Sequence, residues 1–277
     1  MSKNEFKILI KLKIKMNEFG LYEYCITGDL NKIKILIEKD VETKSEYEIQ
    51  HNKNICLRYA SDKGELEIVK YLVEKGADIH DNDDDALCCA SFNNRVDVVT
   101  FLVEKGANVS AKNNWPLRIS CMNGNLQIVK LLIKNGAIIS GFQNQSLIEA
   151  TKKGHLHIIK YLEEKGADIH FENDFALSLA CAYGQLEIVK YLVEKGADIH
   201  GRDDDALRCA SYCGVNFEVV KFLVEMGGNI NVCDDDDKKR IIEIIDDRKK
   251  ELENVLLSTS NMYSDVIGVV KSYVNVY

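Results

Sequence analysis

Residues 64–79 read GELEIVKYLVEKGADI, which is typical of a short amphipathic helix followed by a glycine stop. Ile68, Val69 and Leu72 recur at helical spacing and form an apolar stripe, while charged residues take the opposite face. Gly76 is expected to end the helix in the left-handed conformation that only glycine adopts at low cost. Because a helix of about ten residues is unstable alone, a neighbouring segment must cover this stripe.

The same pattern recurs along the chain at an interval of 30 residues. The leucines that mark the first half of each unit are Leu57, Leu87, Leu117, Leu147, Leu177 and Leu207. The glycines that close the units are Gly76, Gly106, Gly136, Gly166 and Gly196, with Gly227 one residue late. This regularity predicts six repeats of two short helices, stacked so that each repeat covers the next. The fold class is therefore expected to be all-α.

The first helix of each unit is expected to run over the equivalent of Ile55 to Lys63, with a small residue at the Ala60 position for close packing. An Asn or Asp stands three residues before each repeat leucine, and such side chains are strong helix N-caps. The predicted N-caps are Asn54, Asp84, Asn114, Asn144, Asp174 and Asp204. Pro116 falls in the first helical turn, where its missing N–H does no harm.

The stretch 64–79 resembles the second half of an ankyrin repeat, and the resemblance recurs six times over about residues 20–233. Ankyrin repeats usually span about 33 residues and open with Thr-Pro-Leu-His. These units span 30 residues, and only Trp115-Pro116-Leu117-Arg118 keeps the Pro-Leu pair. The resemblance implies an ankyrin-type solenoid of stacked helix-turn-helix repeats, and the missing residues imply shortened hairpin turns. The short repeats and Asp-rich turns also resemble the ankyrin proteins of giant DNA viruses, which implies a viral protein that engages host proteins.

The two ends of the chain differ from the repeats, as capping units should. We expect a basic N-terminal lead-in over residues 1–19, a degenerate capping repeat over 20–50, six repeats over 51–233 and a helical C-terminal cap over 234–277. The matches in the capping repeat are Gly28, Leu30, Ile33 and Leu36, which correspond to Gly64, Leu66, Val69 and Leu72. A polar connection is expected over Thr43–Asn54. The lead-in leaves two alternatives open, which are attraction to a membrane surface and a translation start at Met16.

Composition excludes several classes of function. The net charge of -8 argues against nucleic-acid binding, which needs a basic stripe. No apolar run approaches the roughly 18 residues of a membrane span. Cys89, Cys121, Cys181 and Cys209 fall at core positions, where cysteine acts as a small hydrophobe. No C-x2-C pair faces a second pair, so a zinc site is not expected. We expect a monomer in a reducing compartment, the cytoplasm, or the host cytoplasm if the protein is viral.

The residues that could carry chemistry complete no known site. The segment Asp81–Asp85 resembles the start of a calcium-binding loop, but Ala86 replaces its glycine and Phe92 its glutamate. The histidines at one shared repeat position are His80, His170 and His200, and we expect them to form hydrogen bonds in their turns. No catalytic residue, metal or cofactor is therefore expected.

The two residues before each Gly64-type glycine vary freely while the leucines and glycines do not, and we call them the helix-end positions. In ankyrin proteins these positions lie on the concave side of the first helix, where partners bind. The predicted partner-binding residues are Asp62, Lys63, Phe92, Asn93, Met122, Asn123, Lys152, Lys153, Tyr183 and Tyr212, with Trp115 and Phe175 from the turns. Aromatic side chains there could anchor a partner or simply pack between repeats.

The sequence thus predicts a non-enzymatic scaffold for protein–protein interaction, with acidic rims that favour a basic or mixed partner. The alternative is an adaptor that recruits a ubiquitin ligase through the C-terminal segment 238–277. That segment has no proline, so the Leu-Pro opening of an F-box-like motif is absent.

Overall fold

A computed structural model describes Tyr24 and residues 28–139, 141–212, 217–236, 238–243, 246 and 250. Contacts divide the chain into two units, Met1–Asp168 and Ile169–Tyr277, and each is described by itself. The predicted lead-in, the Met16 start and most of the C-terminal cap, with the ligase-recruiting segment, lie outside the described residues. The boundaries predicted for the four parts of the chain stay predictions.

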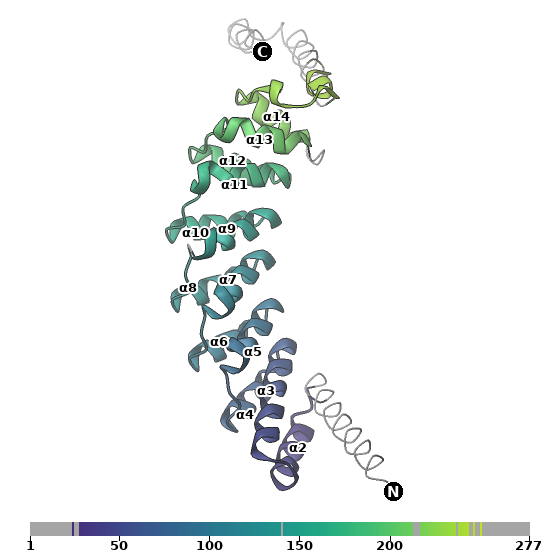
Figure 1. Ribbon diagram of the computed structural model, residues 1–277, viewed down its shortest axis with the longest axis vertical. Helices are drawn as coiled ribbons and strands as arrows, with labels where there is room; N and C mark the ends of the chain where they lie inside the picture. Colours follow the sequence, from purple (N-terminus) through teal and green to yellow (C-terminus); the bar gives the residue numbers. More distant parts are fainter. Residues whose placement is uncertain are drawn as a thin grey trace, which may run out of the picture. The chain divides into compact units, whose positions relative to one another are not determined.

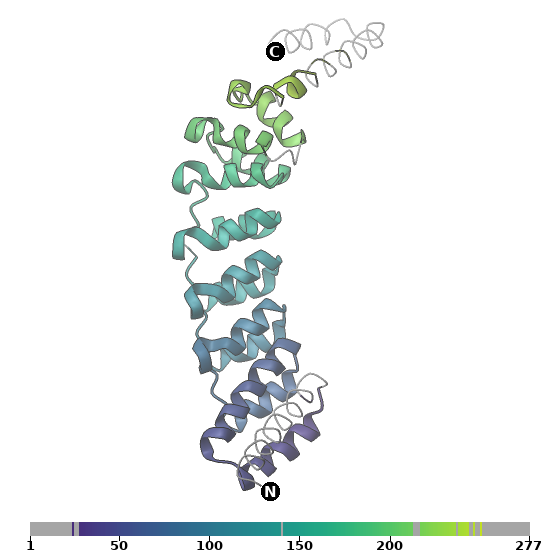
Figure 2. The same ribbon diagram turned by 45° about the vertical axis from the view of Figure 1, so that its right-hand side comes forward.

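The first unit consists of short helices joined by turns (Figure 1). Its helices are α2 Leu30–Thr43, α3 Glu46–Lys63, α4 Leu66–Glu74, α5 Asp81–Phe92, α6 Val96–Glu104, α7 Ala111–Asn123, α8 Leu126–Lys134, α9 Gly141–Lys153 and α10 Leu156–Glu164. From α3 onward the helices pair, and each first helix packs on the next one: α3 on α5, α5 on α7 and α7 on α9. The second helices α4, α6, α8 and α10 pack in the same order, and Figure 2 shows this layering from another angle.

The second unit repeats this arrangement. Its elements are α11 Phe171–Ala182, α12 Leu186–Glu194, α13 Gly201–Tyr212, α14 Phe217–Glu225 and the 3-10 turn η1 Ile230–Val232. Helix α11 packs on α13 and α12 packs on α14. The described residues contain helices and turns and no strand, so the prediction of an all-α array of helix-turn-helix repeats with shortened turns is confirmed. None of the described helices is both long and apolar enough to cross a bilayer.

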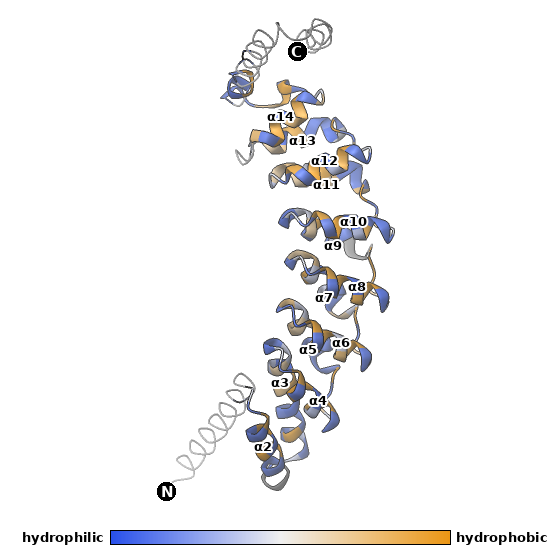
Figure 3. Cartoon of the chain, turned by 180° about the vertical axis from the view of Figure 1, so that it is seen from behind, coloured by the Kyte–Doolittle hydropathy of each residue, from blue (hydrophilic) through white to orange (hydrophobic). Residues whose placement is uncertain are grey.

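The repeat leucines form the core, as predicted. All six first-helix leucines, from Leu57 to Leu207, are at most 2% exposed. The leucines four residues before the closing glycines, from Leu72 to Leu223, are at most 1% exposed. In Figure 3 the hydrophilic colour marks the turns that follow α4, α6 and α8, while hydrophobic residues lie on the helices. Each nine-residue helix therefore gains its stability from the neighbour that covers its stripe.

Glycines end the second helices in the predicted way. Gly76 has a φ of +81°. Its N–H donates to the Val73 carbonyl at 3.0 Å, and the Ala77 N–H donates to the Leu72 carbonyl at 2.9 Å. This pair of bonds satisfies carbonyls that would otherwise lack partners at the helix end.

The shortened turns between repeats contain left-handed residues, which lie at the start of α5, α7, α11 and α13, before the regular part of each helix. Asn82, Asp83 and Asp84 have φ values of +53°, +57° and +55°. Three other turns contain the same run of three left-handed residues, at 112–114, 172–174 and 202–204. Asn and Asp tolerate this conformation better than other non-glycine residues because their short polar side chains can bond locally. The missing residues of each repeat are therefore accommodated by a tight left-handed turn.

At four of the six predicted N-caps the Asn or Asp side chain bonds to the next repeat instead of to the start of its own helix, so the N-cap prediction is wrong there. The Asp84 carboxylate accepts the backbone N–H of Asn108 at 2.8 Å. Three equivalent bonds run from Asp78 N to Asn54, from Ile138 N to Asn114 and from Asp198 N to Asp174. An N-cap residue has extended backbone and bonds two or three residues ahead. At the left-handed positions the side chain instead faces a backbone N–H that lies 24 residues along the chain.

Asn54, Asn144 and Asp204 depart from the N-cap prediction in other ways. Asn54 lies inside α3, which begins at Glu46. The Asn144 side-chain oxygen is buried, and no described residue forms a hydrogen bond with it. Asp204 contacts Nδ1 of His200 at 2.6 Å. The scaffold thus uses this position mainly to join repeats.

The N-terminal repeat departs from the expected form. The segment expected to be a polar connection belongs mostly to α3, because Ser45 and Glu48 form a capping box that starts the helix at Glu46. In α2 the buried residues include Ile33 and Ile37, whereas Leu36 is only half-buried. Ile33 is therefore buried like Val69, the residue that it was predicted to match. Leu36 is not buried like Leu72, so that predicted match is not observed.

The glycines after the first helices are expected to be more sensitive to substitution than those after the second helices. A Cβ on Gly124 would lie 2.6 Å from the His155 ring, whose Nε2 contacts the Met122 carbonyl at 3.0 Å. A Cβ on Gly136 would meet nothing within 4 Å. Both glycines have positive φ, so Gly136→Ala should cost about 1 kcal/mol from backbone strain, and Gly124→Ala about 2–3 kcal/mol from strain and overlap. Urea unfolding measures both, and equal losses would contradict the role given to His155.

Candidate partner-binding surface

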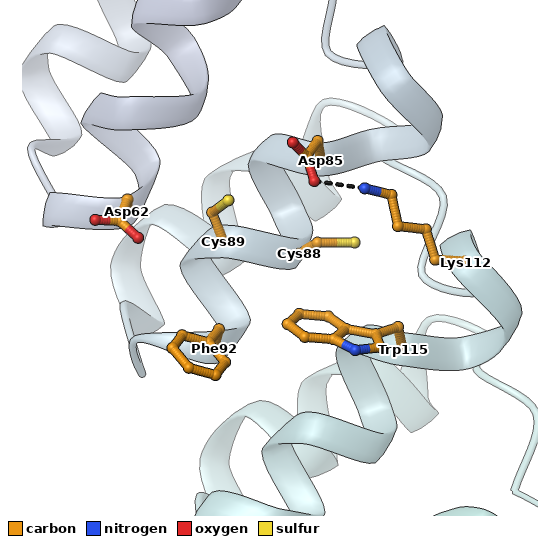
Figure 4. A pocket seen from close by; sticks show the side chains of 7 residues that line it. All are labelled: Asp62, Asp85, Cys88, Cys89, Phe92, Lys112 and Trp115. Atoms are coloured by element: carbon orange, nitrogen blue, oxygen red, sulfur yellow. Dashed lines mark hydrogen bonds and ion pairs between the residues drawn. The ribbon is translucent and has the colours of Figure 1, made fainter. Parts of the chain in front are cut away.

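One hollow of about 290 Å³ lies on the first-helix side of the first unit (Figure 4). Helices α3, α5 and α7 supply its walls. The lining residues are Asp62, Asp85, Cys88, Cys89, Phe92, Lys112 and Trp115. Three of these, Asp62, Phe92 and Trp115, are predicted partner-binding residues that come from three successive repeats. The stacking of the repeats therefore brings them to one place.

The two aromatic rings form the apolar side of the hollow. Phe92 and Trp115 stack with centroids 6.0 Å apart and an angle of 19° between their planes. Phe92 remains 49% exposed despite this contact. The packing of aromatic residues between repeats is thus observed for this pair, while the anchoring of a partner stays a prediction.

The charged side of the hollow is an ion-pair cluster. Asp85 binds the Lys112 ammonium and, at 3.1 Å, the Arg58 guanidinium. Burial acts to raise the pKa of Asp85, but the hydrogen bonds from Lys112 and Arg58 outweigh it and hold that pKa below its ordinary value. The same contact holds the pKa of Lys112 above its ordinary value, against the effect of burial. Both groups are therefore charged at neutral pH.

Asp62 is held differently, at the end of α3. One carboxylate oxygen accepts the Asn93 side-chain amide at 2.6 Å, and the other faces the Lys63 ammonium at 3.1 Å. The Lys63 and Asp62 side chains are 40% and 32% exposed, so this ion pair contributes little. Asp62 therefore offers a carboxylate that is fixed in position but only weakly neutralised.

Sequence reasoning missed the thiol of Cys88, which is buried against the hollow. Burial raises the pKa of Cys88 to about 12 and that of Cys89 to about 11. The signal that could have found Cys88 is its position between Asp85 and Phe92 on one helix face. Both thiols are protonated at neutral pH and supply apolar surface rather than a nucleophile.

Cys88 is expected to resist alkylation in the folded protein. Because burial raises the pKa of Cys88 to about 12, its thiolate fraction at pH 8 is on the order of a thousandfold lower than that of an ordinary thiol. Only the thiolate reacts with the alkylating reagent. The rate should rise with pH until pH approaches about 12. Mass spectrometry after iodoacetamide treatment of folded and urea-unfolded protein measures this, and equal rates would show that the thiol is not buried.

Several other helix-end residues also join repeats. The Asn123 side-chain amide donates to the Phe92 carbonyl at 2.7 Å, and the Met122 carbonyl accepts from His155. Lys152 pairs with Glu149 at 3.5 Å, while Lys153 is exposed. Partner binding by these residues stays a prediction, but Asn93 and Asn123 have a structural role that the sequence alone did not suggest.

The predicted residues of the second unit differ in their exposure. Tyr183 and Tyr212 are 49% and 86% exposed. Phe175 is half-buried, packs edge-on against Phe171 and has the Arg202 guanidinium 5.5 Å from its ring centroid. The tyrosines thus present aromatic surface, while Phe175 is covered by a cation of its own chain.

The histidines at the shared turn position contact the aspartate four residues ahead. The Nδ1–Oδ1 distances are 3.1 Å for His80, 2.6 Å for His170 and 2.6 Å for His200. This confirms the expected hydrogen bonding in the turns. Within the part of the chain that the structure describes, no three His, Cys, Asp or Glu side chains gather where they could hold a metal ion.

Comparisons with known proteins agree with the geometry. The family model described as ankyrin repeats (3 copies) matches residues 4–83, 21–113, 87–173 and 147–234. A solved structure, the crystal structure of the human ASB11 ankyrin repeat domain, is similar with 28% sequence identity and a TM-score of 0.56. The similarity covers 63% of this chain and 84% of that one. No curated protein matches the chain.

Proposed function

The chain belongs to the ankyrin repeat family, and on that premise we propose that it is a non-enzymatic scaffold that binds another protein through its helix-end positions. The observation that carries this proposal is the exposure of aromatic side chains at those positions. Phe92, Tyr183 and Tyr212 are each at least 49% exposed, although other repeats hold polar residues at the equivalent positions, such as Asp62 for Phe92 and Tyr212 and Lys63 for Tyr183. The scaffold does not require an aromatic residue there.

Exposed aromatic residues suit a protein partner for an energetic reason. Large rings bury much apolar area in a complex and lose little side-chain entropy, so they are common among the residues that dominate binding energy. The folded chain gains less from them because half or more of each ring stays in water. Their contribution is therefore largest when a partner covers them.

The test compares partner recovery by the wild type and by a triple variant, Phe92→Ser, Tyr183→Ser and Tyr212→Ser. Proteins captured by the wild type should be lost from the triple variant. Tyr47→Ser is the matched control, because Tyr47 is 78% exposed on α3 but lies outside the helix-end positions. Undiminished recovery by a folded triple variant would contradict the proposal, as would equal loss in the control.

We extend this proposal to the kind of partner and to the cellular compartment. The partner would be a host protein if the protein is viral, and a reducing compartment would be its location. Detection of the chain in the cytoplasm of infected cells would test both, and its secretion with disulfides formed would contradict both.

A further inference from the structure

We propose that the hollow between α3, α5 and α7 holds an arginine side chain of the partner protein, with the guanidinium against Trp115 and Phe92 and paired with Asp62. This inference rests on the proposed function and names the chemistry of the partner. The hollow combines an aromatic side with two carboxylates, of which Asp85 is paired with Lys112 and Arg58 whereas Asp62 is paired with the solvent-exposed Lys63. A planar cation fits both features, because guanidinium stacks on aromatic rings and pairs with carboxylates.

The second unit contains an internal precedent for such a contact. Phe175 occupies the repeat position of Trp115, two repeats later, and the Arg202 guanidinium lies over its ring. Asp85 occupies the repeat position of Trp115 one repeat earlier. It binds Lys112, which occupies the repeat position of Arg202. At both places the following turn of the same chain supplies a cation to this position.

Among the residues that the structure describes, none supplies such a cation to Trp115. The residue at the equivalent turn position is Phe142. Trp115 stacks on Phe92 and borders the hollow, and among the described residues no cation is recorded over its ring. Tryptophan is the aromatic side chain that attracts cations most strongly. An external cation would therefore complete at Trp115 the pairing that the chain completes itself at Phe175.

Asp62 supplies the countercharge. Its carboxylate is oriented by Asn93, and its present cation, Lys63, is solvent-exposed and readily exchanged. Asp85 is already bound by Lys112 and Arg58, and it adds to the electrostatic attraction for a cation without leaving these ion pairs. An arginine that enters the hollow can thus replace the Lys63 contact while the Asp85 cluster stays intact.

The experiment uses the single tryptophan of the chain as a reporter. The indole N–H resonance of Trp115 in 15N-labelled full-length protein is followed during titration with N-acetyl-arginine N-methylamide. The resonance should shift and saturate. N-acetyl-citrulline N-methylamide, which has nearly the same shape but no charge, should bind at least about fivefold more weakly.

Two variants locate the binding. Asp62→Asn keeps the oxygen that accepts from Asn93 and should weaken arginine binding about fivefold. Asp97→Asn removes the same charge from an exposed residue of α6 and should leave it unchanged. Circular dichroism establishes that both variants are folded. The proposal is overturned if no probe gives a saturable shift, if Asp62→Asn binds like the wild type, or if N-acetyl-leucine N-methylamide binds more tightly than the arginine probe.

This outcome is separable from that of the capture experiment. If the arginine probe does not bind but the triple aromatic variant still loses its partners, the scaffold function stands and the arginine site fails. If the probe binds but no captured protein depends on the helix-end residues, the arginine site stands and the scaffold function fails.

Discussion

Leu132→Ala is expected to lower the free energy of unfolding by about 2–5 kcal/mol. Leu132 lies in α8 and is 0% exposed. Helix α8 packs on α7 of its own repeat and on α6 and α10 of the neighbouring repeats. The substitution therefore removes apolar contacts and leaves a cavity that rigid neighbours on both sides cannot fill. Urea unfolding followed by circular dichroism measures the loss.

Leu131→Ala is the matched control, because the adjacent leucine is only half-buried in the same helix. It should cost clearly less than Leu132→Ala. Leu36→Ala should also cost less, since Leu36 is half-buried in α2, and the buried residues of that helix include Ile33 and Ile37. Equal losses for Leu132 and Leu131 would show that burial within the stack does not determine stability.

Asp84→Ala is expected to cost about 2–4 kcal/mol, although Asp84 is neither apolar nor part of a catalytic site. Its carboxylate is only 4% exposed, and it accepts the Asn108 N–H and contacts the His80 ring. Alanine would remove the bond between repeats and would also adopt the left-handed φ of +55° less readily than aspartate does. Both losses add, and the same unfolding experiment measures them.

Asp84→Asn separates the bond from the charge. Asparagine keeps an oxygen for the Asn108 N–H and tolerates the left-handed conformation, so the loss should stay below about 1 kcal/mol. The chain itself supports this, because Asn114 makes the equivalent bond to the Ile138 N–H at 3.3 Å. If Asn and Ala at position 84 destabilise the protein equally, the charge and not the bond between repeats accounts for the effect.

The arrangement of the candidate site shows where sequence reasoning succeeds and where it stops. Phe92 could be identified as exposed because its position varies between repeats while Leu87 does not. Its contact with Trp115 could not be identified, because the two residues belong to different repeats and their distance depends on how closely α5 and α7 pack. The bond by which Asn93 orients Asp62 could not be identified for the same reason, because these two residues also belong to different repeats.

The sequence by itself determined the helices, their glycine ends, the leucine core and the need for stacking. These follow from spacing within one repeat, and a helix of nine or ten residues with one apolar stripe has few other ways to be stable. Only the tertiary structure decided that the Asn and Asp residues bond to the next repeat, that the shortened turns are left-handed, and that α3 extends back to Glu46. Those outcomes depend on which backbone N–H groups a neighbouring repeat presents, and spacing within one repeat carries no information about that neighbour.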